Sequence, residues 1–384
     1  MGPGPDHPGG CANRPRGVGG FFSPHVELTG MQDVLAEWRP AVDEAIRELL
    51  PREVDDAYLG DFFGEPTHRY NAEAIQRALA DPIWALLDRG GKRWRAILFL
   101  ITVDAFGEDP EAYLPYATIP EILHNGTIIV DDVEDEARMR RGGPALHHQH
   151  GTDIALNAGN AMYFIPLKVI ARNSGDLSPA QQLEAYEMLT HELNRTHLGQ
   201  GMDIYWHNQK RVTVDEAQYF EMCACKTGCL ARIVARLAAI VTDQPDDVQR
   251  QVARYAEEMS IAFQIGDDIL DIEHTLDQAG EFGKEFGNDI REGKKTLMVI
   301  HTAEVAPPEE VARLEEILWA EENTDEEILE AIEIMEAAGA VEYAREQAER
   351  LAGSARAHLD GLELEPGPED QLREFTRFVI QREA

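Results

Sequence analysis

Two short aspartate-rich motifs contain residues whose type and spacing could do chemistry. The six carboxylates are Asp131, Asp132, Asp135, Asp267, Asp268 and Asp271. In each motif, DDVED and DDILD, the first and last aspartates lie one helical turn apart and would share a face. Each motif follows an apolar run, which predicts carboxylates at the inner end of a buried helix, where they need a cation beside them. Carboxylate oxygens without histidine or cysteine neighbours favour Mg²⁺, so we expect two opposed faces that hold magnesium and a diphosphate.

Chance and surface charge offer a competing explanation for these motifs. The sequence holds 28 Asp in 384 positions, so a DDxxD pattern is expected by chance roughly 0.15 times, and two such patterns much less often. A solvated acidic helix face is the alternative for either motif taken alone. The apolar residues before each motif favour a buried site instead.

Cations gather in a few short segments of the chain. The segment 90–96, GGKRWRA, places three cations just before an apolar helix, and Arg140-Arg141 follows the first aspartate motif. Further cations lie at Lys226 and in the segment 284–296. Arginine binds phosphate as a bidentate fork and lysine binds it as a point charge. Each segment alone is compatible with surface ion pairs, but together they predict sites for two phosphorylated groups, one held through metal and one held directly by cations.

Several blocks of sequence, taken in order, make the chain similar to a known family. They are GGKRWR, EILHNGTIIVDDVEDEARMRRG, LNAGNAMYF, HLGQGMDIYW, CKTG, FQIGDDILD and KEFGNDIREGKKT, which lie between residues 90 and 296. The chain resembles the trans-isoprenyl diphosphate synthases, and within them most closely the geranylgeranyl diphosphate synthases. The resemblance implies an all-α isoprenoid synthase-type helical bundle with a central active-site cavity, and it implies a homodimer. One departure is Ala96, which stands where the family usually has proline in the first helical turn.

The resemblance also implies roles for individual residues. The six aspartates would bind Mg²⁺, with about three ions per active site, and would form the catalytic set together with Lys226. The pocket for the isopentenyl diphosphate would comprise Lys92, Arg93, His124 and Arg141. The allylic diphosphate would contact Arg140, Lys226, Thr227, Gln264, Lys284 and Lys294.

The implied reaction joins isopentenyl diphosphate to an allylic diphosphate after the allylic substrate ionises. Chain length would depend on the residues four and five positions before Asp131, which are the small Thr127 and Gly126. We therefore expect geranylgeranyl diphosphate, with twenty carbons, for isoprenoid lipid synthesis. A product of twenty-five carbons or more and a catalytically silent subunit of a heteromeric synthase are the alternatives. A class I terpene synthase is disfavoured, because the GGKRWR block and the paired arginines would serve a second diphosphate.

Helices must position these residues, and helical signals continue almost to the end of the chain. Residues 1–30 are rich in glycine and proline and predict a disordered tail, so Met31 is a candidate start of translation. Residues 31–384 contain no linker and predict a single all-helical domain. Helical runs are expected over 96–103, 119–141, 153–170, 182–201, 214–241, 248–271 and 296–304, followed by acidic helices that break near Gly339 and Pro366. Alternating strands with hairpin turns are missing.

The composition limits the partners and the location that we expect. Acids outnumber bases by 71 to 35, and the formal net charge of −36 argues against nucleic acid and anionic membranes. We expect no membrane-spanning stretch of roughly 18 apolar residues and no signal peptide, which predicts a cytoplasmic protein. Seven Lys against 28 Arg, together with abundant carboxylate, is typical of a salt-adapted protein. A GC-rich genome combined with an acidic tail is the alternative.

Two further clusters resemble metal sites, but we expect neither to be one. The cysteines Cys223, Cys225 and Cys229 lack a zinc spacing and are expected to be small residues on a packed helix. The histidines His147, His148 and His150 are expected to form a polar cluster near the diphosphate site.

Overall fold

The computed structural model describes residues 30–173, 175–273 and 287–380, apart from the side chains of residues 379 and 380. Two sequence predictions therefore fall outside the described residues: the N-terminal tail, except for Gly30, and Lys284. Among the residues that are described, the structure is built from helices with one very short hairpin. The all-α prediction is confirmed.

The first half of the fold carries the first aspartate motif. Its elements are α1 (Met31–Leu49), α2 (Asp56–Phe63), α3 (Ala72–Ile75), the π-helical turn η1 (Gln76–Ala80), α4 (Asp81–Leu87), α5 (Trp94–Ala105), the 3₁₀ turn η2 (Pro110–Tyr113), α6 (Leu114–Glu134), β1 (Met139–Arg140), β2 (Gly143–Pro144), α7 (Leu146–His150), α8 (Thr152–Phe164) and α9 (Leu167–Arg172). The antiparallel strands β1 and β2 pair Met139 with Pro144.

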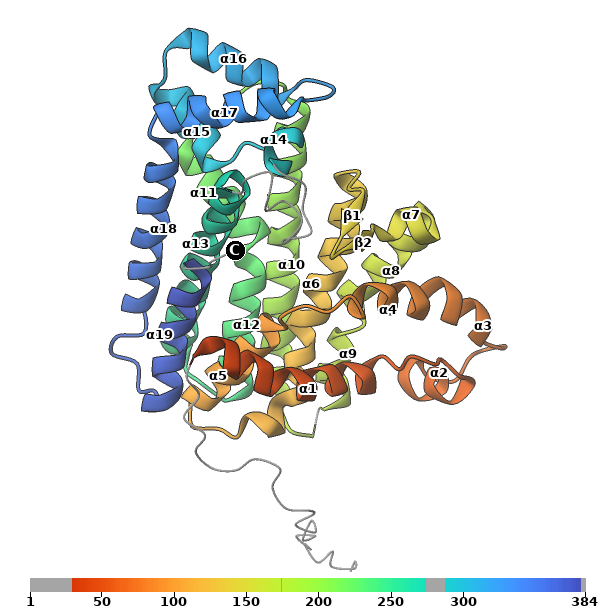
Figure 1. Ribbon diagram of the computed structural model, residues 1–384. Helices are drawn as coiled ribbons and strands as arrows, with labels where there is room; N and C mark the ends of the chain where they lie inside the picture. Colours follow the sequence, from red (N-terminus) through yellow and green to blue (C-terminus); the bar gives the residue numbers. More distant parts are fainter. Residues whose placement is uncertain (1–29, 174, 274–286, 381–384) are drawn as a thin grey trace, which may run out of the picture.

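The second half carries the second motif. Its elements are α10 (Pro179–Asn208), α11 (Glu216–Lys226), α12 (Gly228–Val241), α13 (Asp246–Glu273), α14 (Asn288–Arg291), α15 (Leu297–Val305), α16 (Pro308–Leu318), α17 (Asp325–Ala337), α18 (Ala340–Ala357) and α19 (Pro366–Ile380). Figure 1 shows the long helices α6, α10, α12 and α13 in the centre, with α16 and α17 across one end and α1 to α4 extending at the other.

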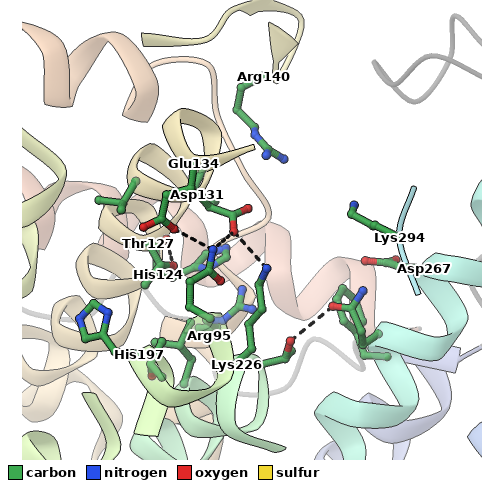
Figure 2. A pocket seen from close by; sticks show the side chains of 18 of the residues that line it. Arg95, His124, Thr127, Asp131, Glu134, Arg140, His197, Lys226, Asp267 and Lys294 are labelled. Carbon is green, nitrogen blue, oxygen red and sulfur yellow. Dashed lines mark hydrogen bonds and ion pairs between the residues drawn. The ribbon is translucent and has the colours of Figure 1, made fainter. Parts of the chain in front are cut away.

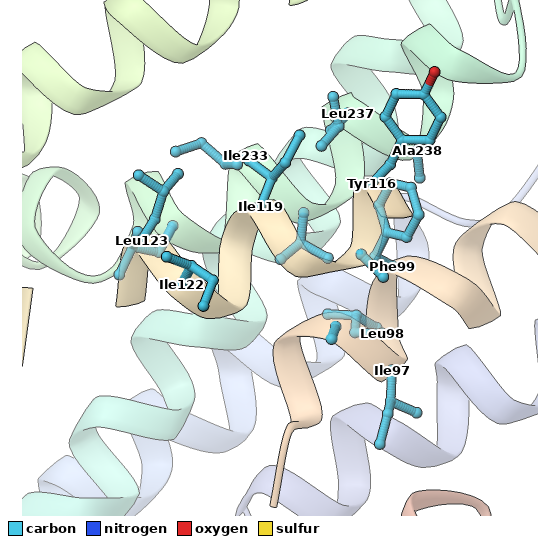
Figure 3. Close-up of a cluster of buried hydrophobic side chains, with 14 of the residues drawn as sticks. Ile97, Leu98, Phe99, Tyr116, Ile119, Ile122, Leu123, Ile233, Leu237 and Ala238 are labelled. Atoms are coloured by element: carbon cyan, nitrogen blue, oxygen red, sulfur yellow. The ribbon is translucent and has the colours of Figure 1, made fainter. Parts of the chain in front are cut away.

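Helix α12 forms the centre of the core because its sequence is apolar on almost every face. Nearly all of its residues are buried, and it packs against α5, α6, α10 and α13. Figure 3 shows its side chains Ile233 and Leu237 beside Ile119 of α6. Helix α13 joins two hydrophobic clusters: its first half packs with α5 and α12, and its second half with α11, α15 and α18. Both aspartate motifs therefore end helices that are fixed by the core on several sides.

Some helix boundaries differ from the sequence prediction, each with a local cause. The run predicted to reach Arg141 ends at Glu134, because Glu136 adopts a left-handed φ of 52° and the β1–β2 hairpin follows. The run predicted over 153–170 is divided at Pro166, and the run over 214–241 is divided at Thr227. The breaks expected near Gly339 and Pro366 lie at the starts of α18 and α19.

One stretch corrects the expectation that no apolar segment is long enough to cross a membrane. Among the described residues, Thr152–Arg172 passes that test by length and composition, but half of the window is buried within the fold. Its small and apolar residues pack α8 against α6, and buried core helices share this composition with membrane spans. The stretch is therefore weak evidence for a membrane span.

Candidate active site

A cavity of about 350 Å³ lies between the ends of the two aspartate-bearing helices. Its walls come from α5, α6, β1, α8, α10, α11, α12, α13 and the segment 289–294. The charged and polar side chains that line it include Arg95, His124, Thr127, Asp131, Glu134, Arg140, Thr196, His197, Gln200, Lys226, Thr227, Gln264, Asp267, Asp268, Asp289 and Lys294. Figure 2 shows Asp131 and Asp267 on opposite sides of this cavity, with Lys226 reaching into the space between them.

The first aspartate motif is already balanced by polar side chains. Asp131 Oδ1 lies 3.1 Å from Lys226 Nζ and accepts a 3.0 Å hydrogen bond from Gln200 Nε2, which also donates to Glu134. Burial acts to raise the pKa of the Asp131 carboxyl, but the positive charges of Lys226 and Arg140 outweigh it. The pKa of Asp131 therefore lies below its ordinary value. Lys226 Nζ also pairs with Asp203 at 2.6 Å. Asp131 is therefore held as an anion inside the protein.

Asp132 and Asp135 take different positions from Asp131. Asp132 is buried on another side of α6 and pairs with Arg140, whose Nη2 lies 2.5 Å from Asp132 Oδ1. Asp135 follows the last residue of α6, and its N–H donates to the Asp131 carbonyl at 2.8 Å. The backbone thus keeps Asp131 and Asp135 one turn apart, as the sequence predicts.

A close helix contact places Lys226. A side chain at Gly199 in α10 would start 2.3 Å from the backbone nitrogen of Lys226, so the glycine lets α10 and the end of α11 touch through their backbones. Helix α11 stops at Lys226 and α12 starts at Gly228, and this break directs Lys226 and Thr227 into the cavity wall.

The second aspartate motif is held mainly by neutral donors. Asp268 accepts hydrogen bonds from Gln264 Nε2 at 2.9 Å and from the hydroxyl of Tyr219 at 3.2 Å. Burial, with Asp289 and Asp267 nearby, raises the pKa of Asp268 to about 8. Asp271 accepts a 3.0 Å bond from the N–H of Asp289. Lys294 bridges Asp289 and Glu292 at 2.8 Å each, and it completes this side of the cavity.

These residues fit a divalent cation. The donors are carboxylate oxygens from two helices, and burial with like charges disfavours the anionic form of Asp268 until a cation is close. Oxygen donors of this kind suit Mg²⁺, which keeps water or phosphate oxygens among its ligands. Among the described residues, no three histidine, cysteine, aspartate or glutamate side chains lie together closely enough to hold an ion alone. Because the two motifs face each other across the cavity, they suit an ion that a phosphate between them also coordinates.

The GGKRWR block forms a tight turn at the start of α5. Gly90 and Gly91 have φ values of 87° and 143°, and Arg93 is left-handed with φ 53°. Conformations with positive φ favour glycine, which accounts for the glycine pair. Arg95 lines the cavity, with its guanidinium 4.0 Å from the centre of the Trp94 ring. Arg93 does not line the cavity: it is buried and pairs with Asp43 and Glu121.

Four arginines surround the His124 imidazole, and we call Arg93, Arg95, Arg140 and Arg141 the arginine corner. Burial, together with these guanidinium groups, lowers the pKa of His124 well below its ordinary value. His124 is therefore neutral at physiological pH. Lys92 is exposed at the same turn, with its Nζ 5.6 Å from the Phe378 ring.

The two residues named from sequence for chain length lie in different places. Thr127 lines the cavity, whereas Gly126 faces α8. A side chain at Gly126 would start 2.8 Å from Met162 Cβ, so this glycine permits the close approach of α6 and α8. Near Thr127 the cavity wall includes Tyr163 from α8 and His197 from α10, whose rings pack edge to face at 5.6 Å.

Sequence reasoning omitted several residues that line the cavity. Arg95, Glu134, Tyr163, His197, Gln200 and Asp289 were not named as site residues, although each lies inside or directly beside a recognised block. Asp203 was also missed, and it is the second carboxylate on Lys226. The block HLGQGMDIYW carried a usable signal, because it places a glutamine and an aspartate close to a glycine that is buried in a helix contact. Neither the cysteine nor the histidine cluster lines the cavity. The three cysteines are buried in α11 and α12, and the three histidines lie in α7, where His147 is close enough to Asp132 to act against the rise in the pKa of that carboxyl.

Sequence comparison agrees with this geometry. A family model described as polyprenyl synthetase matches residues 76–335. Geranylgeranyl pyrophosphate synthase from Geoglobus acetivorans is 33% identical over 353 residues, which cover 92% of this chain and 99% of that relative. Geranylfarnesyl diphosphate synthase from Natronomonas pharaonis is 28% identical, over 92% of this chain and 98% of that relative.

Structural comparison gives the same result. Geranylgeranyl pyrophosphate synthetase from Pyrococcus horikoshii superimposes with a TM-score of 0.79 and 27% identity, over 92% of this chain and 99% of that chain. Geranylgeranyl pyrophosphate synthase from Corynebacterium glutamicum, solved with isoprenyl diphosphate and magnesium, shares the fold at 22% identity, with a TM-score of 0.75 over 91% and 99% of the two chains. The family model covers more than half of the chain and the relatives match it nearly end to end, so the chain belongs to the polyprenyl synthetase family of Mg²⁺-dependent prenyltransferases.

Proposed function

We propose that this prenyltransferase condenses isopentenyl diphosphate with an allylic diphosphate to give geranylgeranyl diphosphate for isoprenoid lipid synthesis. One observation carries the proposal: a single cavity joins two opposed carboxylate motifs to an arginine corner on one side and to Lys226 and Lys294 on the other. Two diphosphates need two such cationic regions, and only one of them needs metal ions.

The allylic diphosphate lies between the two aspartate motifs. About three Mg²⁺ ions, held by Asp131, Asp135, Asp267, Asp268 and Asp271, would neutralise the negative charge that develops on the departing diphosphate. Lys226, Thr227, Gln264 and Lys294 line this side of the cavity, and Arg140 stands above it. Asp132 serves this side indirectly, because it holds Arg140 by an ion pair. Lys284 keeps its proposed role at the allylic diphosphate, outside the described residues.

The isopentenyl diphosphate lies at the arginine corner. Lys92, Arg95, His124 and Arg141 supply its contacts, since Arg95 and His124 line the cavity and the other two flank the same turn. We assign Arg95 to this pocket in place of Arg93, because the Arg93 guanidinium already donates to Asp43, Glu121 and the Leu87 carbonyl. The neutral His124 can accept or donate a hydrogen bond without adding charge.

The bond changes follow from these positions. The allylic C–O bond breaks, and the electron pair leaves with the diphosphate that Lys226 and Lys294 face. The double bond of isopentenyl diphosphate forms a new C–C bond to the allylic cation, and a proton then leaves to the released diphosphate. The cavity is also lined by Thr127, Leu230 and Phe263, which are uncharged and do not form a bond to the cation.

We expect product length to depend on the part of the cavity wall that Thr127, Tyr163 and His197 form. Thr127 is small and lines the cavity beside α6, and the Tyr163–His197 ring pair lines the same cavity. This arrangement supports a chain of twenty carbons. A longer product requires that the ring pair move or be replaced.

Two copies of the chain pair through α8 and α10. Phe164, Leu183, Leu198 and Tyr205 are large apolar residues that are more than half exposed on these helices, and exposed apolar faces of this kind mark contact surfaces. The three on α10 lie within a narrow sector of the helix. The strong excess of carboxylate over lysine supports a salt-adapted protein, and we propose a cytoplasmic location for it.

Diphosphate release tests the proposed reaction. With Mg²⁺, the protein should release diphosphate only when isopentenyl diphosphate and an allylic primer are both present, and excess chelator should stop the release. Release from the allylic primer alone would indicate a terpene synthase. No release from any pair of substrates would indicate a silent subunit, and either result would overturn the proposal.

A further inference from the structure

A chain of buried polar contacts runs behind the arginine corner. Arg93 Nε donates to Asp43 in α1 at 2.8 Å, and Arg93 Nη1 donates to Glu121 Oε1 at 3.2 Å. The same Glu121 oxygen accepts from Asn125 Nδ2 at 3.1 Å. Asn125 Oδ1 accepts from Arg141 Nη1 at 3.0 Å, and Arg141 Nη1 also donates to the Gly90 carbonyl at 2.8 Å. The contacts connect α1, the 90–95 turn, α6 and the hairpin.

Glu121 and Asn125 are fully enclosed by protein. The exposed fraction is 3% for Glu121 and 0% for Asn125, and neither residue lines the cavity. Asn125 is fixed from three sides, because its amide nitrogen also donates to the Glu121 carbonyl at 2.7 Å. A buried amide with three short contacts has little freedom to reorient, so the oxygen that Arg141 meets is fixed in space.

The backbone of the turn is built around the same groups. A side chain at Gly91 would start 3.4 Å from Arg93 Nη1 and 3.6 Å from Arg141 Nη1, so the two guanidinium groups lie against this glycine. Arg93 itself adopts a left-handed conformation that arginine rarely takes, and its three hydrogen bonds hold it there. The turn that carries Lys92 and Arg95 therefore depends on where Glu121 places Arg93.

Charge gives Glu121 a second effect. Arg93, Arg95, Arg140 and Arg141 repel one another, and burial together with Arg93 and Arg140 lowers the pKa of Arg141. Glu121 opposes that shift and also pairs with Arg93. It does not line the cavity, so it offsets repulsion among the arginines without occupying the cavity side of Arg95, which can meet a phosphate.

We propose that Glu121 and Asn125 are positioning residues for the isopentenyl diphosphate site. Neither touches the substrate: Asn125 orients Arg141, and Glu121 orients Arg93 and with it the turn that carries Arg95. The inference rests on the proposed function, because it assigns isopentenyl diphosphate to the arginine corner. It predicts that loss of these contacts weakens the binding of isopentenyl diphosphate and leaves the binding of the allylic diphosphate unchanged.

The test compares Asn125→Leu and Glu121→Gln with the control Thr118→Val. Thr118 is a buried residue of the same helix whose hydroxyl donates only within α6, to Pro115 at 2.6 Å. Loss of one hydrogen bond to a charged group corresponds to roughly a tenfold change or more. Asn125→Leu should therefore raise KM for isopentenyl diphosphate at least about tenfold and should change KM for the allylic primer less than about twofold. Glu121→Gln should show the same split with a smaller effect, and Thr118→Val should change neither KM.

A double variant and a binding measurement complete the design. If Asn125 acts through Arg141, adding Asn125→Leu to Arg141→Met should weaken isopentenyl diphosphate binding by less than about twofold beyond Arg141→Met alone. Calorimetric titration with isopentenyl diphosphate without primer should show the same loss in Asn125→Leu. Equal rises in both KM values, additive effects in the double variant, or unchanged binding in Glu121→Gln would each overturn the inference. A wild-type protein that turns over no substrate pair would instead remove the proposed function on which it rests.

Discussion

The two cationic regions of the cavity are built in different ways. In the arginine corner, Arg141 and Arg93 are fixed by groups that do not line the cavity: Asn125 and the Gly90 carbonyl hold Arg141, and Asp43 and Glu121 hold Arg93. Arg140 is the exception, because it pairs with Asp132 of the first aspartate motif. Lys226 and Lys294 are instead held by carboxylates that lie at or near the proposed metal ligands, namely Asp131, Asp203 and Asp289. One region is pre-arranged, and the other must exchange partners when ions bind.

The difference suits the two substrates. Isopentenyl diphosphate keeps its diphosphate through the reaction, so a fixed set of forked donors serves it from start to finish. The allylic diphosphate leaves, and the charge that develops on it is met by ions and by compact ammonium groups. We therefore expect the substrate that keeps its diphosphate to be held mainly by arginine, together with Lys92. The substrate that loses it is held mainly by lysine and metal, together with Arg140.

The largest effect should come from the carboxylates between the regions. Asp131→Ala and Asp267→Ala should each lower kcat by roughly a thousandfold or more. Each variant removes a carboxylate that would hold Mg²⁺, so the negative charge on the leaving diphosphate is less well stabilised. The measurement is product formation at saturating substrate and Mg²⁺. Asp360→Ala is the control, since that carboxylate pairs with Arg373 on the surface. Near wild-type turnover in both aspartate variants would contradict the site.

A smaller effect should separate arginine from lysine. Arg95→Lys should raise KM for isopentenyl diphosphate roughly tenfold, because lysine cannot form the bidentate fork. Lys226→Arg should change KM for the allylic primer by less than about threefold, because arginine can still pair with Asp131 and Asp203. Steady-state kinetics with one substrate varied at a time gives both numbers. A larger rise in KM for Lys226→Arg than for Arg95→Lys would show that the two regions do not differ as described.

A change in the cavity wall at Tyr163 should alter product length and should hardly affect the reaction rate. Tyr163→Ala removes one ring of the Tyr163–His197 pair and should add at least one five-carbon unit to the main product, because the growing chain gains room. Mass spectrometry of the diphosphates measures the shift. The control is Tyr186→Phe, which removes a hydroxyl that donates to the Leu167 carbonyl, away from the cavity. An unchanged product in Tyr163→Ala would place the limit elsewhere.

The smallest effect should come from an arginine outside the cavity. Arg313 pairs with Glu316 and Glu330 on the surface of α16 and α17, and exposed ion pairs contribute little to stability. Arg313→Met should leave both KM values unchanged and should shift the thermal midpoint only slightly. A change in either KM would mean that this acidic end of the fold communicates with the cavity.

Much of the fold could be predicted from the sequence because helical periodicity is a local property. The run before Asp131 and the run before Asp267 are apolar at helical spacing, and they form α6 and α13. The end of α6 was predicted too late, because the turn at Glu136 depends on the hairpin and not on a proline or glycine signal. The single domain over 31–384 stays a prediction.

The site was predictable where motif and geometry coincide, and less so elsewhere. Spacing alone places Asp131 and Asp135 on one face, but it does not say that Asp132 turns toward Arg140. Likewise, adjacent arginines in GGKRWR look equivalent in the sequence. Only the left-handed backbone at Arg93 sends that side chain toward Glu121 and leaves Arg95 at the cavity.

Product analysis tests the central claim most directly. The purified chain is incubated with Mg²⁺, isopentenyl diphosphate and each allylic primer of five, ten and fifteen carbons, and the products are identified by mass spectrometry. We predict that all three primers are extended to a twenty-carbon diphosphate. If none of the three primers is extended, the account is contradicted, because a cavity with two working diphosphate regions must join the two substrates.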